Sequence, residues 1–142
     1  MCLKACLVGK NRLHARQGCI ASTLAKPVYG SMYAHASCTG GGQSLYSVYS
    51  NFDKFAYLAS YSAYLTPEVM NTYFPDLQSK MPQLKLMWFG VGTSDFLYQN
   101  VLDHLAYFDE KGISYEKMFT EGGHTWMNAR TYLAETLQKF FK

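Results

Sequence analysis

The sequence has few charged residues and no hydrophobic run long enough to cross a bilayer. Charged side chains make up 16% of the 142 residues, and the formal net charge is +3. Because the lysines and arginines are scattered along the chain, we expect no nucleic-acid partner. No apolar stretch approaches the roughly 20 residues of a transmembrane helix, and residues 1–9 lack the apolar core of a signal peptide. We therefore expect no membrane partner, and the sequence leaves localisation and oligomeric state unknown.

Cysteine is scarce as well, and its spacing argues against two of its common uses. Three of the four cysteines lie within the first 19 residues, and the fourth is Cys38. There is no C-x-x-C pair, and no histidines stand at the spacing of a zinc site. The sequence therefore predicts neither a disulfide framework nor a metal site, and it calls for no cofactor.

The composition is that of a folded domain whose pattern changes near residue 35. Hydrophobic residues make up 49% of the chain, enough for a buried core at this length. Residues 1–35 form a poorly patterned head, in which 1–27 show no clear strand or helix. Residues 36–142 are regular, and a strand over 28–36 leads into them.

Strands and helices are predicted to alternate along this regular part. The expected strands cover 28–36, 55–61, 84–91 and 113–119. The expected helices cover 42–50, 66–80 with a break at Pro75, 95–110 and 127–141. This alternation predicts an α/β fold with a mostly parallel sheet and helices on both of its faces.

Three residues in this part have the types and the order of a hydrolytic triad. A glycine-rich turn at 36–43 follows the first predicted strand, Asp95 follows a buried strand, and His124 lies in a loop after two glycines. Each stands at the carboxyl end of a predicted parallel strand, where such folds collect their sites. The order nucleophile, acid, histidine is that of an α/β-hydrolase. Taken singly, each has a plain alternative: a tight turn, a helix cap at Asp95 or a loop histidine.

The nucleophile position of this turn falls on Cys38. A nucleophile elbow has the form G-x-S-x-G, and Gly40 supplies its last glycine while Ala36 replaces the first. A thiolate is a competent nucleophile when a histidine activates it. The backbone N–H of Thr39 would then donate to the oxyanion. Ser37 and Ser44 are weaker candidates, because one precedes the turn and the other falls inside the helix.

The other histidines fit a catalytic role less well than His124. His14 and His35 lie in the poorly patterned head, and His104 lies inside a predicted helix beside Asp103, where we expect it to be solvated. Trp126, two residues after His124, is the expected anchor of the histidine loop.

Four segments together resemble a known family. They are 40–45 (GGGQSL), 52–57 (FDKFAY), 92–95 (GTSD) and 122–124 (GGH). They resemble the esterase D-like α/β-hydrolases, and within these the feruloyl and acetyl-xylan esterases of carbohydrate esterase family one. Since a whole α/β-hydrolase sheet has about eight strands and needs roughly 240 residues, the resemblance covers the C-terminal half of such a domain.

The resemblance implies a carboxylic ester hydrolase acting on feruloyl or acetyl esters of plant polysaccharide such as xylan. It places the nucleophile at Cys38, assigns the orientation of the histidine to Asp95 and makes His124 the general base. It implies no cofactor and a small or polysaccharide-linked ester as partner, and members of the family are often secreted.

The chain departs from the family pattern at the elbow and upstream of it. Cys38 replaces the family's serine, and residues 1–35 resemble nothing in the family. Two alternatives therefore stay open beside an active esterase. The chain is a catalytically inactive remnant joined to an unrelated head, or it is a cysteine hydrolase resembling the dienelactone hydrolases, with Cys38 as its native nucleophile.

Overall fold

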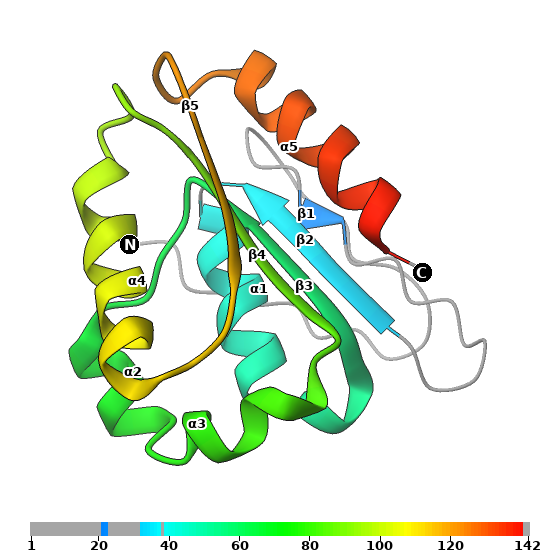
Figure 1. Cartoon of the computed structure of the whole chain (residues 1–142), viewed down its shortest axis with the longest axis vertical. Helices are drawn as coiled ribbons and strands as arrows, with labels where there is room; N and C mark the ends of the chain where they lie inside the picture. Colours follow the sequence, from blue (N-terminus) through cyan, green and yellow to red (C-terminus); the bar gives the residue numbers. More distant parts are fainter. Residues whose placement is uncertain (1–20, 23–31, 38, 141–142) are drawn as a thin grey trace.

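The computed structural model describes residues 21–22, 32–37 and 39–140. They form one twisted sheet with helices packed against both faces (Figure 1). The elements in chain order are β1 (Ala21–Ser22), β2 (Met32–Ser37), α1 (Thr39–Tyr49), η1 (Phe52–Lys54), β3 (Phe55–Tyr61), α2 (Pro67–Tyr73), α3 (Leu77–Lys80), η2 (Met81–Gln83), β4 (Leu86–Gly92), α4 (Tyr98–Lys111), β5 (Glu116–Thr120) and α5 (Trp126–Lys139).

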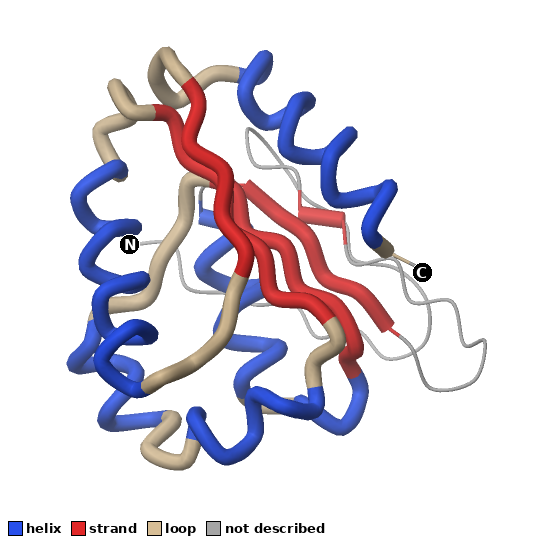
Figure 2. The backbone as a smooth tube through the Cα atoms, viewed as in Figure 1, coloured by secondary structure: helices blue, strands red, loops and turns tan. Residues whose placement is uncertain are grey.

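The sheet has the strand order β1-β2-β3-β4-β5. Neighbouring strands from β2 to β5 run parallel, and β1 pairs antiparallel with β2. In Figure 2 the parallel strands lie side by side, with helical connections between them. The α/β prediction of a mostly parallel sheet is confirmed, and the carboxyl ends of four strands meet at one edge.

The four strands predicted from the sequence are all present, and one further strand was missed. The strand β1 consists of two residues within 1–27, the segment that showed no clear strand or helix. Two residues are too few to produce an alternating pattern, so no periodicity could have revealed this strand.

Two hydrophobic cores hold the layers together. Alternate residues of β4 point to opposite faces, as the period of two along a strand requires. Met87 and Phe89 join the core beneath α1, α2 and α4. Trp88 packs on the other face with Tyr61 and with Tyr132 of α5. Within the described ranges, α5 is the helix that covers this second face (Figure 1).

Local sequence signals set the ends of several helices. Thr66 caps α2 by accepting a hydrogen bond from the Val69 N–H, and Pro67 is the first helical residue. The predicted break at Pro75 separates α2 from α3. Gly112 ends α4 in the left-handed conformation at φ 65°. None of the helices described here is long and apolar enough to cross a membrane.

Candidate active site

Asp95 and His124 form a hydrogen-bonded pair at the carboxyl edge of the sheet. The distance from His124 Nδ1 to Asp95 Oδ2 is 2.9 Å. Asp95 follows β4 and His124 follows the adjacent strand β5, so parallel pairing of these strands brings their loops together. The aspartate accepts this hydrogen bond, so Nδ1 carries the proton and Nε2 of the neutral ring is left as an acceptor. This tautomer is the one that a general base requires.

The Asp95 side chain is fully buried, and both of its oxygens have partners. Oδ1 accepts a hydrogen bond from the Leu97 N–H at 2.9 Å, and Oδ2 accepts the one from His124. The helix α4 begins at Tyr98 with Leu97 as its cap residue, so Asp95 stands before the helix and is not its N-cap. A buried acid satisfied on both oxygens is held in one orientation.

Close backbone approach between the two loops fixes the distance between Asp95 and His124. The Ser94 N–H donates to the Gly122 carbonyl at 2.9 Å, and the Thr93 N–H donates to the Thr120 carbonyl at 2.8 Å. A Cβ atom on Gly92 would lie 2.3 Å from the Gly122 carbonyl oxygen. Glycine at position 92 is therefore a steric requirement of this contact.

Asn128 holds the histidine loop from the first turn of α5. Its Nδ2 donates to the carbonyl oxygens of Glu121, at 3.1 Å, and Gly123, at 3.0 Å. Thr125 caps the same helix by accepting a hydrogen bond from the Asn128 N–H. The expectation that Trp126 anchors the loop is wrong, because 58% of its surface is exposed. The anchor is the amide side chain of Asn128, which the sequence analysis missed.

Tyr132 of α5 is hydrogen-bonded to the end of β5, the strand that leads to the histidine loop. Its hydroxyl shares a hydrogen bond with the Thr120 hydroxyl at the end of β5. Burial raises the pKa of Tyr132, and the negative charge of Asp95 adds to this effect. The tyrosine therefore stays neutral and serves as a hydrogen-bonding support for the end of β5.

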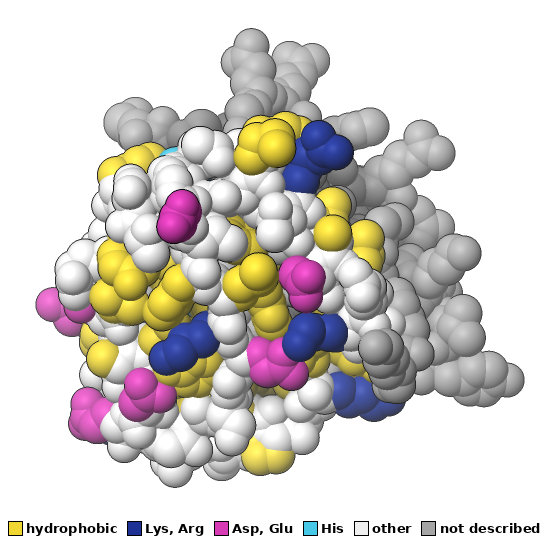
Figure 3. Space-filling view, turned by 45° about the horizontal axis from the view of Figure 1, so that its top comes forward, with side chains coloured by type: hydrophobic (Ala, Val, Ile, Leu, Met, Phe, Trp, Pro, Cys, Tyr) yellow, Lys and Arg dark blue, Asp and Glu magenta, His cyan; other side chains and the backbone are white. Residues whose placement is uncertain are grey.

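His124 is the member of the pair that reaches the surface. A quarter of its side chain is exposed, whereas that of Asp95 is not exposed at all. The Phe96 ring lies beside the imidazole, with the two ring centroids 4.9 Å apart. In Figure 3 a histidine side chain reaches the surface at the top of the molecule, with hydrophobic side chains near it. Part of the imidazole is therefore open to solvent.

The predicted nucleophile, Cys38, lies outside the described residues. The strand β2 ends at Ser37 and α1 begins at Thr39, so a single position separates them. A strand followed by a helix after one residue is the order of elements around a nucleophile elbow. The rival Ser44 is buried within α1. The assignments of Cys38 as nucleophile and of the Thr39 N–H as oxyanion donor stay predictions.

The expectation that His104 is solvated is wrong. Its side chain is fully buried, and its Nδ1 lies within hydrogen-bond distance of both the Leu65 N–H, at 2.9 Å, and the Leu65 carbonyl oxygen, at 3.0 Å. Its Nε2 lies 3.4 Å from the Tyr49 hydroxyl, and the rings of Phe89 and Phe108 pack against it. Burial lowers the pKa of His104 to about 4. This histidine is a neutral part of the core and is separate from the Asp95–His124 pair.

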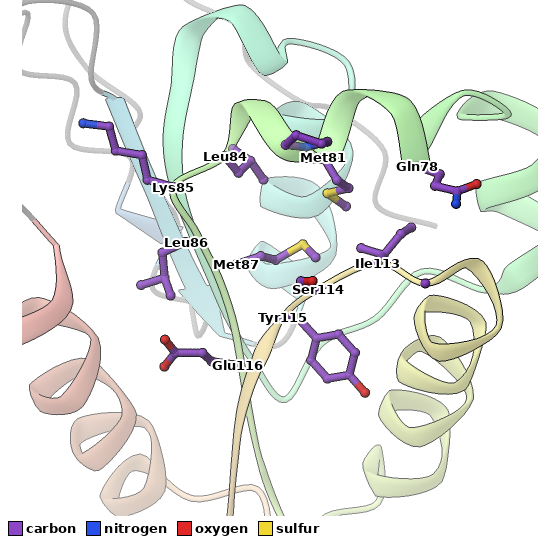
Figure 4. A pocket seen from close by; sticks show the side chains of 12 residues that line it. Gln78, Met81, Leu84, Lys85, Leu86, Met87, Ile113, Ser114, Tyr115 and Glu116 are labelled. Carbon is purple, nitrogen blue, oxygen red and sulfur yellow. The ribbon is translucent and has the colours of Figure 1, made fainter.

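A cavity of about 440 Å³ lies at the opposite end of the sheet, by the amino ends of β4 and β5. Figure 4 shows apolar side chains such as Met87 and Ile113 lining it. Its charged residues, Lys85 and Glu116, are exposed, and Glu116 pairs with Lys139. Since Asp95 and His124 follow the carboxyl ends of these strands, the cavity is not part of their site. The described residues contain no cluster of three or more potential metal ligands.

The chain is similar in fold to solved hydrolase structures. No family model matches it, and no curated protein matches it by sequence. A ferulic acid esterase superposes with a TM-score of 0.64 at 16% identity, covering 71% of this chain and 47% of the esterase.

Two structures from Staphylococcus aureus give similar results. The S-formylglutathione hydrolase has a TM-score of 0.57 at 22% identity, covering 74% of this chain and 49% of that one. The fluorophosphonate-binding serine hydrolase F has a TM-score of 0.62 at 19% identity, and the match covers 75% of this chain and 52% of the hydrolase. The chain thus has a partial α/β-hydrolase fold and spans about half the length of each structure.

Proposed function

We propose that the chain is a carboxylic ester hydrolase that uses His124 as its general base. The observation that carries this proposal is the 2.9 Å hydrogen bond between His124 Nδ1 and the buried Asp95. It fixes the tautomer that leaves Nε2 facing away from the acid as a proton acceptor. The likeness in fold to a ferulic acid esterase and to two other hydrolases adds support.

In the proposed reaction His124 takes up and returns one proton during acylation and one during deacylation. Nε2 takes the proton of the nucleophile at position 38, and the nucleophile attacks the ester carbonyl carbon. The tetrahedral oxyanion is stabilised by the Thr39 N–H. When the C–O bond breaks, His124 returns the proton to the leaving alkoxide, and an acyl-enzyme remains. Water, deprotonated by the same imidazole, then attacks the acyl carbon. As the acid is released, His124 returns this proton to the departing atom of residue 38, and Asp95 stabilises the imidazolium in both halves of the reaction.

For the substrate we propose a feruloyl or acetyl ester carried on plant polysaccharide such as xylan. This finer assignment is supported by the family resemblance of four sequence segments and by the name of one structural neighbour, a ferulic acid esterase. No metal ion or cofactor enters the proposed reaction, because the nucleophile, the imidazole and backbone N–H groups supply all of its proton transfers and charge stabilisation.

The test compares hydrolysis of p-nitrophenyl acetate and methyl ferulate by the wild-type chain and by variants. His124→Ala should lower kcat/KM by about 10²–10⁴-fold, because proton transfer by a positioned base contributes a factor of this size. The control is Asp103→Asn, which removes a carboxylate from the exposed surface of α4 and should leave kcat/KM unchanged.

A Cys38→Ser variant separates the remaining alternatives. If Cys38→Ser turns over esters faster than the wild type, the site is that of a serine hydrolase in which cysteine has replaced the serine. If it is slower, Cys38 is the native nucleophile. If all variants, including Cys38→Ser, are inactive on both esters, the chain is an inactive remnant and the proposed function is wrong.

A further inference from the structure

The described surface carries its exposed large hydrophobic side chains unevenly. In the part of the chain that the structure describes, these side chains are Tyr46, Tyr73, Phe96, Trp126, Met127 and Leu137. Three of them, Phe96, Trp126 and Met127, lie within three residues of Asp95 or His124 in the sequence. Half of these residues therefore lie in the loop after β4 or at the start of α5, close in sequence to the Asp95–His124 pair.

Phe96 is the most exposed of the six and also the one in contact with the candidate base. Its exposed fraction is 74%, and its ring centroid lies 4.9 Å from that of His124. Exposing an aromatic ring to water is unfavourable, and Phe96 gains no burial in the described structure that offsets this cost. A ligand that lies on the ring would remove this surface from water.

The chemistry of the base decides which part of an ester reaches Phe96. His124 must come within hydrogen-bond distance of the leaving oxygen in order to protonate it. The carbon atoms directly beyond this oxygen belong to the alcohol portion of the ester. Because Phe96 lies beside the imidazole, these carbon atoms come close to its ring, whereas the acyl group is bound to the nucleophile at this stage.

We propose that Phe96 forms the alcohol subsite and selects esters whose alcohol portion presents an apolar face next to the ester oxygen. This inference rests on the proposed ester hydrolysis and extends it from the acyl group to the leaving group. Trp126 and Met127, at the start of α5, continue the apolar surface beyond Phe96. One face of a sugar ring presents C–H groups and can lie on the Phe96 ring as an aromatic alcohol does, whereas a short polar alcohol offers no such face.

The test uses three acetate esters that share one acyl group: ethyl acetate, benzyl acetate and glyceryl monoacetate. In the wild-type chain, kcat/KM for benzyl acetate should exceed that for each of the other two by about tenfold, the effect of burying one ring face. Phe96→Ser should remove this preference, so that the three acetates are hydrolysed with similar kcat/KM. Phe96→Tyr keeps the ring and should keep the preference.

Two controls assign the effect to this position. Tyr73→Ser removes another exposed aromatic ring, at the end of α2, which Figure 1 places well apart from the loops after β4 and β5. This variant should behave like the wild type. Ethyl acetate, ethyl propionate and ethyl butyrate vary the acyl group alone, and their relative rates should be the same in Phe96→Ser and in the wild type.

A binding measurement keeps this inference separate from the proposed function. N-benzylacetamide, the amide analogue of benzyl acetate, should shift the NMR signals of the Phe96 and His124 rings in the wild type, and it should leave the His124 signals unshifted in Phe96→Ser. Such shifts without ester turnover would contradict the hydrolase proposal and retain the apolar subsite. Turnover with equal rates for the three acetates, unchanged in Phe96→Ser, would overturn the subsite alone.

Discussion

At the scale of single residues, the geometry of the Asp95–His124 pair depends on a position that has no side chain. Gly92 has no side chain, yet a Cβ atom there would lie 2.3 Å from the Gly122 carbonyl oxygen and 2.7 Å from Asn128 Nδ2. Gly122 belongs to the loop that carries His124, and Asn128 is the residue of α5 that holds this loop. The hydrogen bond between Asp95 and His124 therefore depends on the absence of a Cβ atom at Gly92, the last residue of β4.

Gly92→Ala should lower both stability and ester hydrolysis. The added methyl group forces the loops after β4 and β5 apart, at an expected cost of about 1–3 kcal/mol for overpacking. The Asp95–His124 hydrogen bond should lengthen, so kcat should fall. The measurements are urea denaturation and kcat/KM corrected for the folded fraction.

Gly112→Ala is the matched control for this experiment. Gly112 has a φ of 65° and no heavy atom within 4 Å of an added Cβ. The variant should lose roughly 1 kcal/mol through backbone strain alone. Its kcat/KM per folded molecule should be unchanged. Equal losses of activity in the two variants would contradict the role assigned to Gly92.

The burial of His104 predicts an acid-sensitive stability. Its pKa is about 4 in the folded chain, because burial disfavours the charged ring, against 6.5 for an unperturbed histidine. Between these values the unfolded chain binds the additional proton. The stability that the chain gains by burying neutral His104 is therefore fully present above pH 6.5, and it is lost as the pH falls toward 4. Urea denaturation should show a free energy of unfolding about 2 kcal/mol lower at pH 5 than at pH 7 from this group.

The variant His104→Asn isolates this contribution. The Asn Oδ1 atom stands near the position of His Nδ1 and can accept the Leu65 N–H, but the side chain does not titrate. The variant should be less sensitive to pH between 7 and 5 by the same amount. An identical pH dependence in wild type and variant would show that His104 does not control it.

At the scale of elements, two helices begin with the same capping contact but differ in their distance from the site. Thr66 and Thr125 each accept a hydrogen bond at 3.3 Å from the backbone N–H three residues ahead, in α2 and α5 respectively. The first cap lies in the connection after β3, and the second directly follows His124. Comparing variants of the two threonines therefore separates an effect on stability from an effect on the position of His124.

Thr66→Ala and Thr125→Ala should each destabilise the chain by about 1 kcal/mol, the usual value of an N-cap hydrogen bond. Only Thr125→Ala should lower kcat, because it loosens the start of α5 and with it the Asn128 amide that holds the Gly123 carbonyl. The measurements are thermal denaturation and steady-state hydrolysis. A loss of kcat in both variants, or in neither, would contradict this account of the histidine loop.

Helices and strands with a long hydrophobic pattern or a clear capping signal were predictable from the sequence, whereas a very short strand was not. The apolar run of β4 and the capped start of α2 produce clear signals, and both elements are found where expected. The two-residue strand β1 produces none. His104 was wrongly expected to be solvated, because one polar residue beside Asp103 does not reveal that the Leu65 backbone lies against it.

The candidate site was predictable in part for the same reason. Asp95 and His124 follow successive parallel strands, so chain order alone predicted that they meet. Asn128 and Phe96 were missed, because their contacts depend on how two loops fold back on each other. The glycine at 92 and the glycines at 122 and 123 were the available signal for that close approach.

At the scale of the whole molecule, the chain spans about half the length of the hydrolases that share its fold. The described part nevertheless contains the acid, the histidine, both loops that carry them and the helix that holds the second loop in place. Because the four strands β2 to β5 run parallel, these loops and the carboxyl end of β2 lie at one edge of the sheet. The central claim is therefore that position 38 and His124 act together as nucleophile and base.

Trapping the acyl-enzyme tests this claim most directly. The chain is mixed briefly with p-nitrophenyl acetate, quenched in acid and analysed by peptide mass spectrometry. The account predicts one acetyl group on the peptide that contains residue 38, disappearing with time as water releases it, and no such adduct in His124→Ala. Acetyl groups found only on lysine or tyrosine side chains, in equal amounts in wild type and His124→Ala, would contradict it.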